Sequence, residues 1–167
     1  MFKPGSRVVD LGSWPGGWLQ VAAGLVGNTG QVIGIDLVAL DPLLSPNVTF
    51  LQGDATDQAQ QEKILSLLAG PADIVLSDMS PKLSGIRETD DARAMELCRT
   101  ALTCARKLLR PGGELLLKVF MGSEYKAFLA ELCVAFTKVK STRPEATRKG
   151  SAETYVFAMG LRKNCEV

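Results

Sequence analysis

The sequence predicts an α/β protein in which helices cover both faces of a mostly parallel, seven-stranded sheet. Strand-like and helix-like stretches alternate along the whole chain, as they do where a helix connects each pair of parallel strands. The expected strands are near-continuous apolar runs, which is typical of strands buried on both faces. The last two have no helix between them, so we expect an antiparallel pair at one edge. The expected strands lie at residues 8–11, 31–36, 48–54, 73–78, 114–120, 137–141 and 154–159.

The first element, residues 7–18, predicts a buried strand, a tight glycine turn and the start of a helix. Gly12 stands where the chain must turn, and Pro15 suits an early helix position because its missing N–H is not needed there. Gly16 and Gly17 remove side chains where a ligand would lie against the backbone. This arrangement predicts a cradle for an adenosine-containing cofactor. Because Gly12 and Gly16 stand four apart, the loop is not Gly-x-Gly-x-x-Gly, which favours S-adenosylmethionine over NAD.

The same loop holds both tryptophans of the chain. We expect Trp18 to face the cofactor. Trp14 fits either packing within the loop or a wall beside the cofactor, and the sequence leaves both open.

Helices are expected at residues 58–68, 90–109 and 124–135. The second is long and is ended by the Arg-Pro-Gly-Gly run at 110–113. It carries an apolar stripe at three- and four-residue steps. The stripe consists of Ala94, Cys98, Ala101, Ala105 and Leu108. We find no internal repeat or linker, so residues 1–167 are expected to form one domain.

Four aspartates follow strand-like runs at their carboxyl ends, where ligands of parallel sheets bind. Any one of them could be a turn or helix-cap residue. Together with the glycine loop they predict a site, with Asp36 accepting hydrogen bonds from ribose hydroxyls, Asp54 from the adenine amino group, and Asp78 near the reactive end of the cofactor. Asp10 ends the first strand. Such a negative wall suits a sulfonium cation better than a pyrophosphate.

Composition excludes several classes of protein. The chain has no histidine, which excludes Ser-His-Asp hydrolysis and His-based zinc chemistry. Its net charge of +1 gives no global attraction for nucleic acid, so an RNA-binding face must be local. We expect no metal and no membrane segment, a cytoplasmic location, and four reduced thiols rather than a disulfide or zinc framework. The thiols are those of Cys98, Cys104, Cys133 and Cys165.

Basic residues gather in the segment 138–153. A solvated loop is the default interpretation of such a run, and an edge that contacts RNA phosphates is the alternative, joined by Lys82 and Arg87. The basic residues of the segment are Lys138, Lys140, Arg143, Arg148 and Lys149.

Four blocks, in order and covering essentially the whole chain, resemble the signature blocks of the FtsJ/RlmE-type ribosomal RNA 2′-O-ribose methyltransferases. They lie at residues 10–18, 78–81, 117–120 and 143–155. The resemblance implies a Rossmann-like methyltransferase fold and S-adenosylmethionine as cofactor. It also implies that the chain is an enzyme whose RNA partner is a large-subunit rRNA or ribosomal subunit, methylated at a uridine ribose. We expect it to act as a monomer.

The resemblance also implies site residues. Of a Lys-Asp-Lys-Glu catalytic tetrad, three members map to Asp78, Lys118 and Glu153, with Lys118 as proton acceptor. The matching cofactor positions are Gly16, Trp18, Asp36, Asp54 and Asp78. The first tetrad Lys belongs to a helix well upstream of the glycine loop. Here Met1 lies only nine residues before Asp10, and Lys3 is too close to the first strand, so this helix is expected to be missing.

The chemistry can also be argued from the residues. With no histidine, Lys118 in an apolar strand is the natural candidate base, since burial lowers the pKa of a lysine. Asp78 and Glu153, if adjacent, would raise that pKa instead. We therefore expect Lys118 to orient the hydroxyl and to accept its proton late. The alternatives are a snorkelling edge-strand lysine at 118 and a solvated carboxylate at 153.

Two other functions are weighed. The first is a truncated or weakly active chain that only binds cofactor and RNA. The second is an NAD-dependent oxidoreductase, disfavoured by the glycine spacing and by the lack of histidine or a Tyr-x-x-x-Lys pair.

Overall fold

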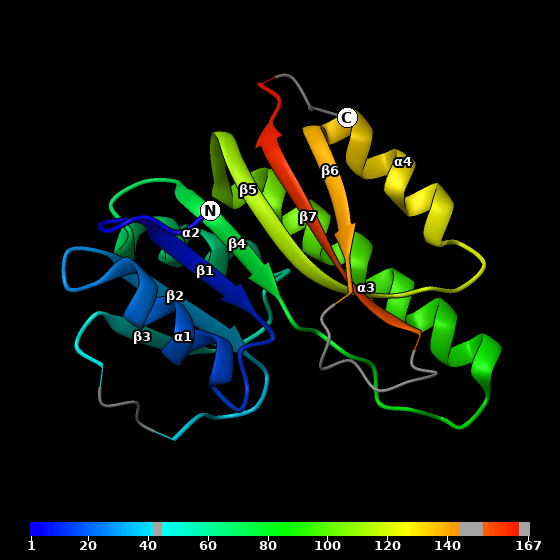
Figure 1. The fold of residues 1–167 in the computed structure, drawn as a ribbon. Helices are drawn as coiled ribbons and strands as arrows, with labels where there is room; N and C mark the ends of the chain where they lie inside the picture. The colour runs from blue at the N-terminus through cyan, green and yellow to red at the C-terminus, as the bar shows by residue number, and fades with distance from the viewer. Residues whose placement is uncertain (42–44, 144–151, 164–167) are drawn as a thin grey trace.

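The structure is a computed structural model that describes residues 1–41, 45–143 and 152–163 (Figure 1). Its elements confirm the predicted alternation. In chain order they are β1 (Arg7–Leu11), α1 (Gly17–Val26), β2 (Gln31–Asp36), β3 (Val48–Gln52), α2 (Gln58–Leu67), β4 (Ala72–Ser77), α3 (Arg87–Leu108), β5 (Leu109–Phe120), α4 (Tyr125–Ala135), β6 (Phe136–Thr142) and β7 (Glu153–Leu161).

The strands form one seven-stranded sheet in the order β3-β2-β1-β4-β5-β7-β6. The pairs from β3 to β5 are parallel, whereas β7 runs antiparallel to both β5 and β6. The predicted antiparallel edge pair is thus confirmed, and β7 lies between β5 and β6 rather than outermost (Figure 1). The chain leaves β1 on one side for β2 and later crosses to the other side for β4. Ligands of such sheets bind at this reversal, beyond the carboxyl ends of the strands.

Helices cover both faces of the sheet, as expected. Helix α1 packs on one face, where Leu19 and Val26 join a buried cluster with Val8 of β1 and Ile74 of β4. The other three helices pack on the opposite face, where Phe128 of α4 lies within the larger cluster. Each fully buried side chain of this size stabilises the fold by about 1.5–3 kcal/mol.

Helix α3 confirms the predicted apolar stripe, because all five of its members are buried. The helix begins at Arg87, three residues before the predicted start. Asp90 is therefore not its first residue but accepts hydrogen bonds from Ser84 N at 2.7 Å and Gly85 N at 3.1 Å. This carboxylate fixes the loop that precedes the helix.

Strand β5 begins earlier than predicted. Leu109, expected to end the helix, already pairs with Ala72 of β4, and the next pair is Ile74 with Glu114. The four residues 110–113 therefore bulge out of the ladder. The Arg-Pro-Gly-Gly run ends the helix as predicted, but it does so inside a strand.

The described residues contain no helix long and apolar enough to cross a membrane, and no group of three or more His, Cys, Asp or Glu side chains placed to hold a metal. Cys98 and Cys104 are buried free thiols and Cys133 is an exposed one. Cys165 lies outside the described residues.

Candidate active site

The glycine loop between β1 and α1 is fixed to the end of β2. Gly12 N and Ser13 N both donate to the Ile35 carbonyl, at 2.9 and 3.3 Å. Gly12 has a φ of +73°, and a Cβ there would lie 2.6 Å from Met79 Cγ, so this position requires glycine. Gly16, with a φ of +100°, caps α1. Packing against Met79 thus explains why glycine is needed at position 12, and the left-handed backbone conformation of the helix cap explains why glycine is found at position 16.

Asp36 and Asp54 lie at neighbouring strand ends and are held by local hydrogen bonds. Asp36 Oδ2 accepts from Trp14 N at 2.9 Å, and its Oδ1 accepts from Val38 N at 2.8 Å. Asp54 Oδ1 accepts from both the N and the Oγ1 of Thr56, at 2.8 Å each. Both carboxylates therefore stabilise local turns, which is the role expected of a single aspartate after a strand. A carboxylate accepts about four hydrogen bonds, so these contacts orient them and leave acceptor capacity.

Asp10 differs from the other strand-end aspartates because it is completely buried. Within the described part of the chain, neither of its oxygens has a hydrogen-bond partner, and neither does the buried hydroxyl of Ser13. Burial, together with the nearby charges of Asp78 and Asp36, raises the pKa of Asp10 to about 8. The carboxyl is therefore mostly neutral at pH 7, and it does not add to a negative wall.

The closest contact between predicted catalytic residues joins Lys118 and Asp78. Ser77 of β4 pairs with Leu117 of β5, so the next residues of the two strands are also neighbours. Lys118 Nζ lies 2.5 Å from Asp78 Oδ1 and donates to the Asp78 carbonyl at 3.3 Å. The lysine side chain is only 11% exposed and its strand is internal, which contradicts a snorkelling edge-strand lysine.

Glu153 begins β7 and is linked to the site through Tyr155. In the ladder, Tyr155 pairs with Lys118 and Glu153 with Phe120, so Glu153 lies diagonally from the lysine on the same face. Tyr155 Oη donates to Glu153 Oε1 at 3.1 Å, and burial followed by this carboxylate raises the pKa of Tyr155 to about 12.

Tyr155 is a site residue that the sequence reasoning missed. Its ring lies beside that of Trp18, with centroids 5.9 Å apart and planes tilted by 33°. It therefore connects the first turn of α1 with Glu153. The two-residue spacing from Glu153 along one strand was the available signal, because residues two apart share a face.

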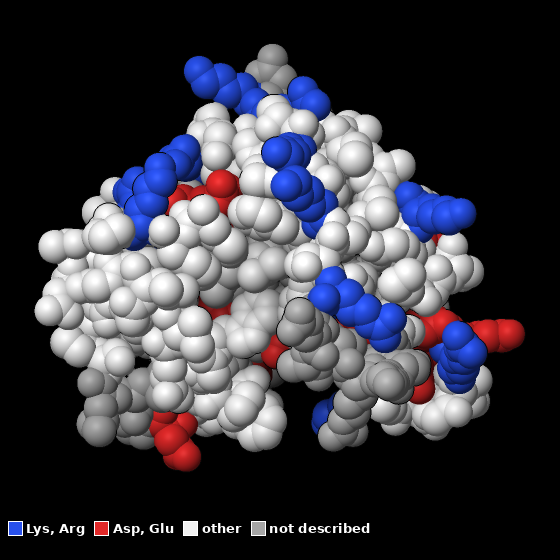
Figure 2. Space-filling view, viewed as in Figure 1, with Lys and Arg blue, Asp and Glu red and all other residues white. Residues whose placement is uncertain are grey.

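The predicted basic edge is only partly described. Lys138 and Lys140 are exposed on β6, and Lys82 and Arg87 are exposed after β4. Figure 2 shows basic side chains around a central area of this face in which acidic atoms are visible. Arg148 and Lys149 lie outside the described residues. Through β7, Lys138 lies level with Glu114 of β5, four residues from Lys118 along that strand, and Lys140 lies level with Leu116. These two lysines therefore fit a solvated surface, whereas Lys82 and Arg87 follow Asp78 and still fit a phosphate-binding edge.

These residues together fit a cationic, adenosine-containing ligand. The glycine loop, the Trp18 ring and the oriented carboxylates lie at the reversal point of the sheet. Two buried polar groups beneath the loop, on Asp10 and Ser13, have no partner among the described residues. Beside them, Lys118 and Asp78 form a polar pair that can bind a hydroxyl.

Comparison with known proteins gives a consistent result. The family described as FtsJ-like methyltransferase matches residues 1–161. The chain is 46% identical over 164 residues to a Ribosomal RNA large subunit methyltransferase E from Syntrophobacter fumaroxidans, covering 98% of this chain and 83% of the relative. A protein of the same name from Pseudomonas aeruginosa is 42% identical over 163 residues, covering 97% and 78%.

Solved structures show the same fold. A ribosomal RNA methyltransferase from Plasmodium falciparum superimposes with a TM-score of 0.83 at 26% identity, covering 96% of this chain and 89% of that one. Fibrillarin from Aeropyrum pernix, solved with S-adenosyl-L-methionine, has a TM-score of 0.62 at 18% identity, covering 94% and 67%. The fibrillarin likeness concerns the fold alone.

Proposed function

Because this chain belongs to the FtsJ-like methyltransferase family, we propose that it transfers a methyl group from S-adenosylmethionine to a ribose 2′-hydroxyl of large-subunit rRNA. The names of its relatives support large-subunit rRNA as the substrate. The four sequence blocks that resemble the family support the ribose hydroxyl, and a uridine as its nucleotide. We also propose that the chain is a monomer, which light scattering after size exclusion would test, and that it acts in the cytoplasm.

The cofactor, when bound, supplies an electrophilic methyl group on a sulfonium. The proposed cofactor residues are Gly16, Trp18, Asp36, Asp54 and Asp78. The Trp18 ring offers an apolar face beside Tyr155, and the carboxylates of Asp36 and Asp54 are pre-oriented acceptors for hydroxyl and amino groups. Pre-orientation lowers the entropy lost on binding.

Lys118, Asp78 and Glu153 are the proposed catalytic residues, and Lys118 is central. An ammonium has three N–H groups, and the two contacts of Lys118 given above are both with Asp78. A third N–H can bind the ribose oxygen and fix its direction of approach. We propose that, as the new oxygen–carbon bond forms, Lys118 passes one of its own protons to the Asp78 carboxylate and takes the hydroxyl proton in its place, so that the pair as a whole gains one proton. Glu153, held by Tyr155, lies beside this pair and would bind the acceptor.

The observation that carries the proposal is the 2.5 Å contact between Lys118 Nζ and Asp78 Oδ1 at the carboxyl ends of β4 and β5. The test is transfer of labelled methyl from S-adenosylmethionine to undermethylated large ribosomal subunits. Label mapped to a ribose 2′-oxygen is the expected result. Lys118→Ala should lower the rate by about 10²- to 10⁴-fold, whereas Lys63→Ala, on the exposed surface of α2, should not.

The alternative of a binding module is not favoured by the relatives, which are named as methyltransferases. Lys3 does not take the place of the first tetrad lysine. It precedes β1 and lines a hollow with Gly112 and Glu114, at the amino ends of the strands. Cofactor binding without any methyl transfer by the wild type would contradict the enzymatic proposal and support the alternative.

A further inference from the structure

The tip of the glycine loop exposes an indole that the proposed chemistry does not use. Trp14 is 55% exposed, although tryptophan is among the most buried side chains on average. Trp18, four residues later, instead packs against the apolar cluster beneath α1. Packing within the loop, one of the two roles predicted for Trp14, therefore does not account for its side chain.

The backbone beneath this indole is held firmly. Trp14 N donates to Asp36 Oδ2 at 2.9 Å, and Gly16 N donates to the Ser13 carbonyl at 2.7 Å. Ser13 N in turn donates to the end of β2. A loop fixed at three points presents an aromatic face without needing to order itself when a ligand arrives.

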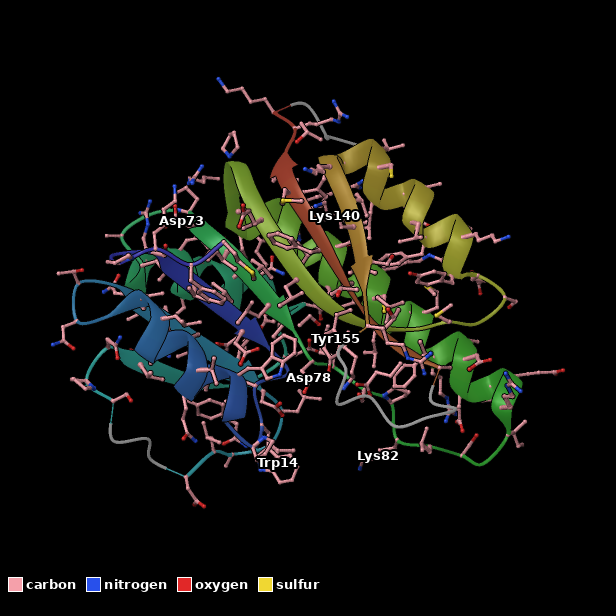
Figure 3. All side chains as sticks on the ribbon, in the orientation of Figure 1. Trp14, Asp73, Asp78, Lys82, Lys140 and Tyr155 are labelled. Atoms are coloured by element: carbon pink, nitrogen blue, oxygen red, sulfur yellow. The ribbon has the colours of Figure 1, made fainter. Side chains whose placement is uncertain are left out.

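The indole lies at the same end of the molecule as the proposed acceptor site. Figure 3 shows Trp14 and Lys82 at the lower edge of the view, with Asp78 above and between them. Lys82 is exposed and follows Asp78 by four residues. An exposed aromatic face and an exposed cation thus lie at the same end of the molecule as Asp78, and this is the combination that single-stranded nucleic acid binds.

The depth of the catalytic lysine makes an aromatic contact useful to the substrate. The Lys118 side chain is only 11% exposed, so a ribose that reaches it must leave the regular stack of an RNA helix. Its base, or the base next to it, then loses a stacking partner. An exposed, fixed aromatic ring replaces that partner whatever the base, because every base has a π-face.

We infer that Trp14 stacks on an unstacked base of the RNA acceptor and so holds the target ribose at Lys118. The inference rests on the proposed function. It makes Trp14 a substrate-positioning residue, and it assigns Lys82 to the neighbouring phosphate.

Fluorescence tests the contact without requiring catalysis. The chain has two tryptophans, so Trp18→Phe leaves Trp14 as the sole indole reporter. A single-stranded oligoribonucleotide of about 10 nucleotides should quench its emission, whereas a duplex of the same sequence, whose bases are already stacked, should not. Equal quenching by both, or by neither, overturns the inference.

Kinetics separate an RNA contact from a cofactor contact. Trp14→Leu keeps an apolar side chain and Trp14→Tyr keeps an aromatic one. We expect Trp14→Leu to raise the KM for RNA by about 5- to 150-fold, which corresponds to the 1–3 kcal/mol of one stacked base. Trp14→Tyr keeps an aromatic ring and should recover most of the lost RNA affinity. The KM for S-adenosylmethionine should stay within about 2-fold. Val134→Ala, 68% exposed on α4, is the matched control.

Each outcome has one meaning. A rise in the KM for S-adenosylmethionine equal to that for RNA overturns the inference and places the indole against the cofactor. Unchanged kinetics in Trp14→Leu, with an active wild type, also overturns it. If the wild type itself transfers no methyl, the proposed function fails, and the fluorescence titration alone decides whether Trp14 binds unstacked bases.

Discussion

Substituting the buried Asp10 by asparagine should change how the stability of the protein depends on pH. Asp10 lies on the face of β1 that carries α1, because it is two residues from Val8 of that cluster. Helix α1 has no charged residue. Among the described residues, the carboxylates of Asp78 and Asp36 act on Asp10, and both oppose its ionisation.

The sign follows from proton binding. The pKa of Asp10 rises from 3.8 to about 8 on folding, so between these values the native state holds a proton that the unfolded state has released. The stability contribution is complete below pH 3.8 and is lost as pH rises to about 8. Its slope is about −1.4 kcal/mol per pH unit. Between about pH 6 and 7.5 the wild type should lose about 2 kcal/mol relative to Asp10→Asn.

Urea unfolding of the free protein at several pH values measures this difference. Other titrating groups occur in both proteins, so their effects cancel when the variant is subtracted. The buried amide of Asp10→Asn can shift the free energy of unfolding by the same amount at every pH, and such a shift does not change how the difference between the two proteins depends on pH. Asp41→Asn, which removes an exposed carboxyl, is the matched control and should follow the wild type.

Parallel stability curves for wild type and Asp10→Asn from about pH 5 to 9 would refute the reasoning. They would mean that Asp10 ionises normally despite its burial. A variant that loses stability more steeply with pH than the wild type would refute it as well.

Two further predictions concern the loop and the ladder. Gly12→Ala should destabilise the protein by about 1–3 kcal/mol, because the residue has a positive φ and its Cβ would meet Met79. Gly17→Ala, with open space around its Cβ at the first position of α1, should not destabilise the protein and should raise its stability to urea by up to about 1 kcal/mol. A large rise in the Kd of Gly17→Ala for S-adenosylmethionine would then show that the ligand, not the fold, requires this glycine. Tyr155→Phe removes the donor to Glu153 and keeps the ring, so it should cost about 0.5–1.5 kcal/mol in urea unfolding and lower kcat, and an unchanged kcat would contradict the positioning role of the hydroxyl.

The sequence predicted the sheet well because its signals are local. Apolar runs and their turn residues lie within each element, and all seven strands and four helices occur close to where they were expected. The observed elements differ from the predicted ones where contact with a distant segment determines the local conformation. Leu109 continues the helical pattern, yet pairing with Ala72 makes it a strand residue. Asp90 was expected to begin a helix, and instead it fixes the preceding loop through Ser84.

The site was predicted less completely, for the same physical reason. The contact between Lys118 and Asp78 follows from pairing of β4 with β5, which the alternation of elements already suggested. The neutral state of Asp10 depends on burial by several elements at once, and no local sequence pattern predicts such burial. The spacing from Glu153 could have indicated that Tyr155 shares its face, but the contact of Tyr155 with Trp18, from the other end of the chain, depends on β7 lying next to β5.

The relative positions of the proposed catalytic residues therefore depend on strand register more than on any loop. Lys118 and Tyr155 are paired across one ladder, and Glu153 shares their face because it is two residues from Tyr155. A slip of one residue between β5 and β7 would turn the lysine and the glutamate to opposite faces of the sheet. Apolar residues opposite each other in the same ladder, such as Leu117 and Val156, would then lose their buried positions. The burial that stabilises the sheet thus also fixes the distance between the groups proposed to bind the acceptor.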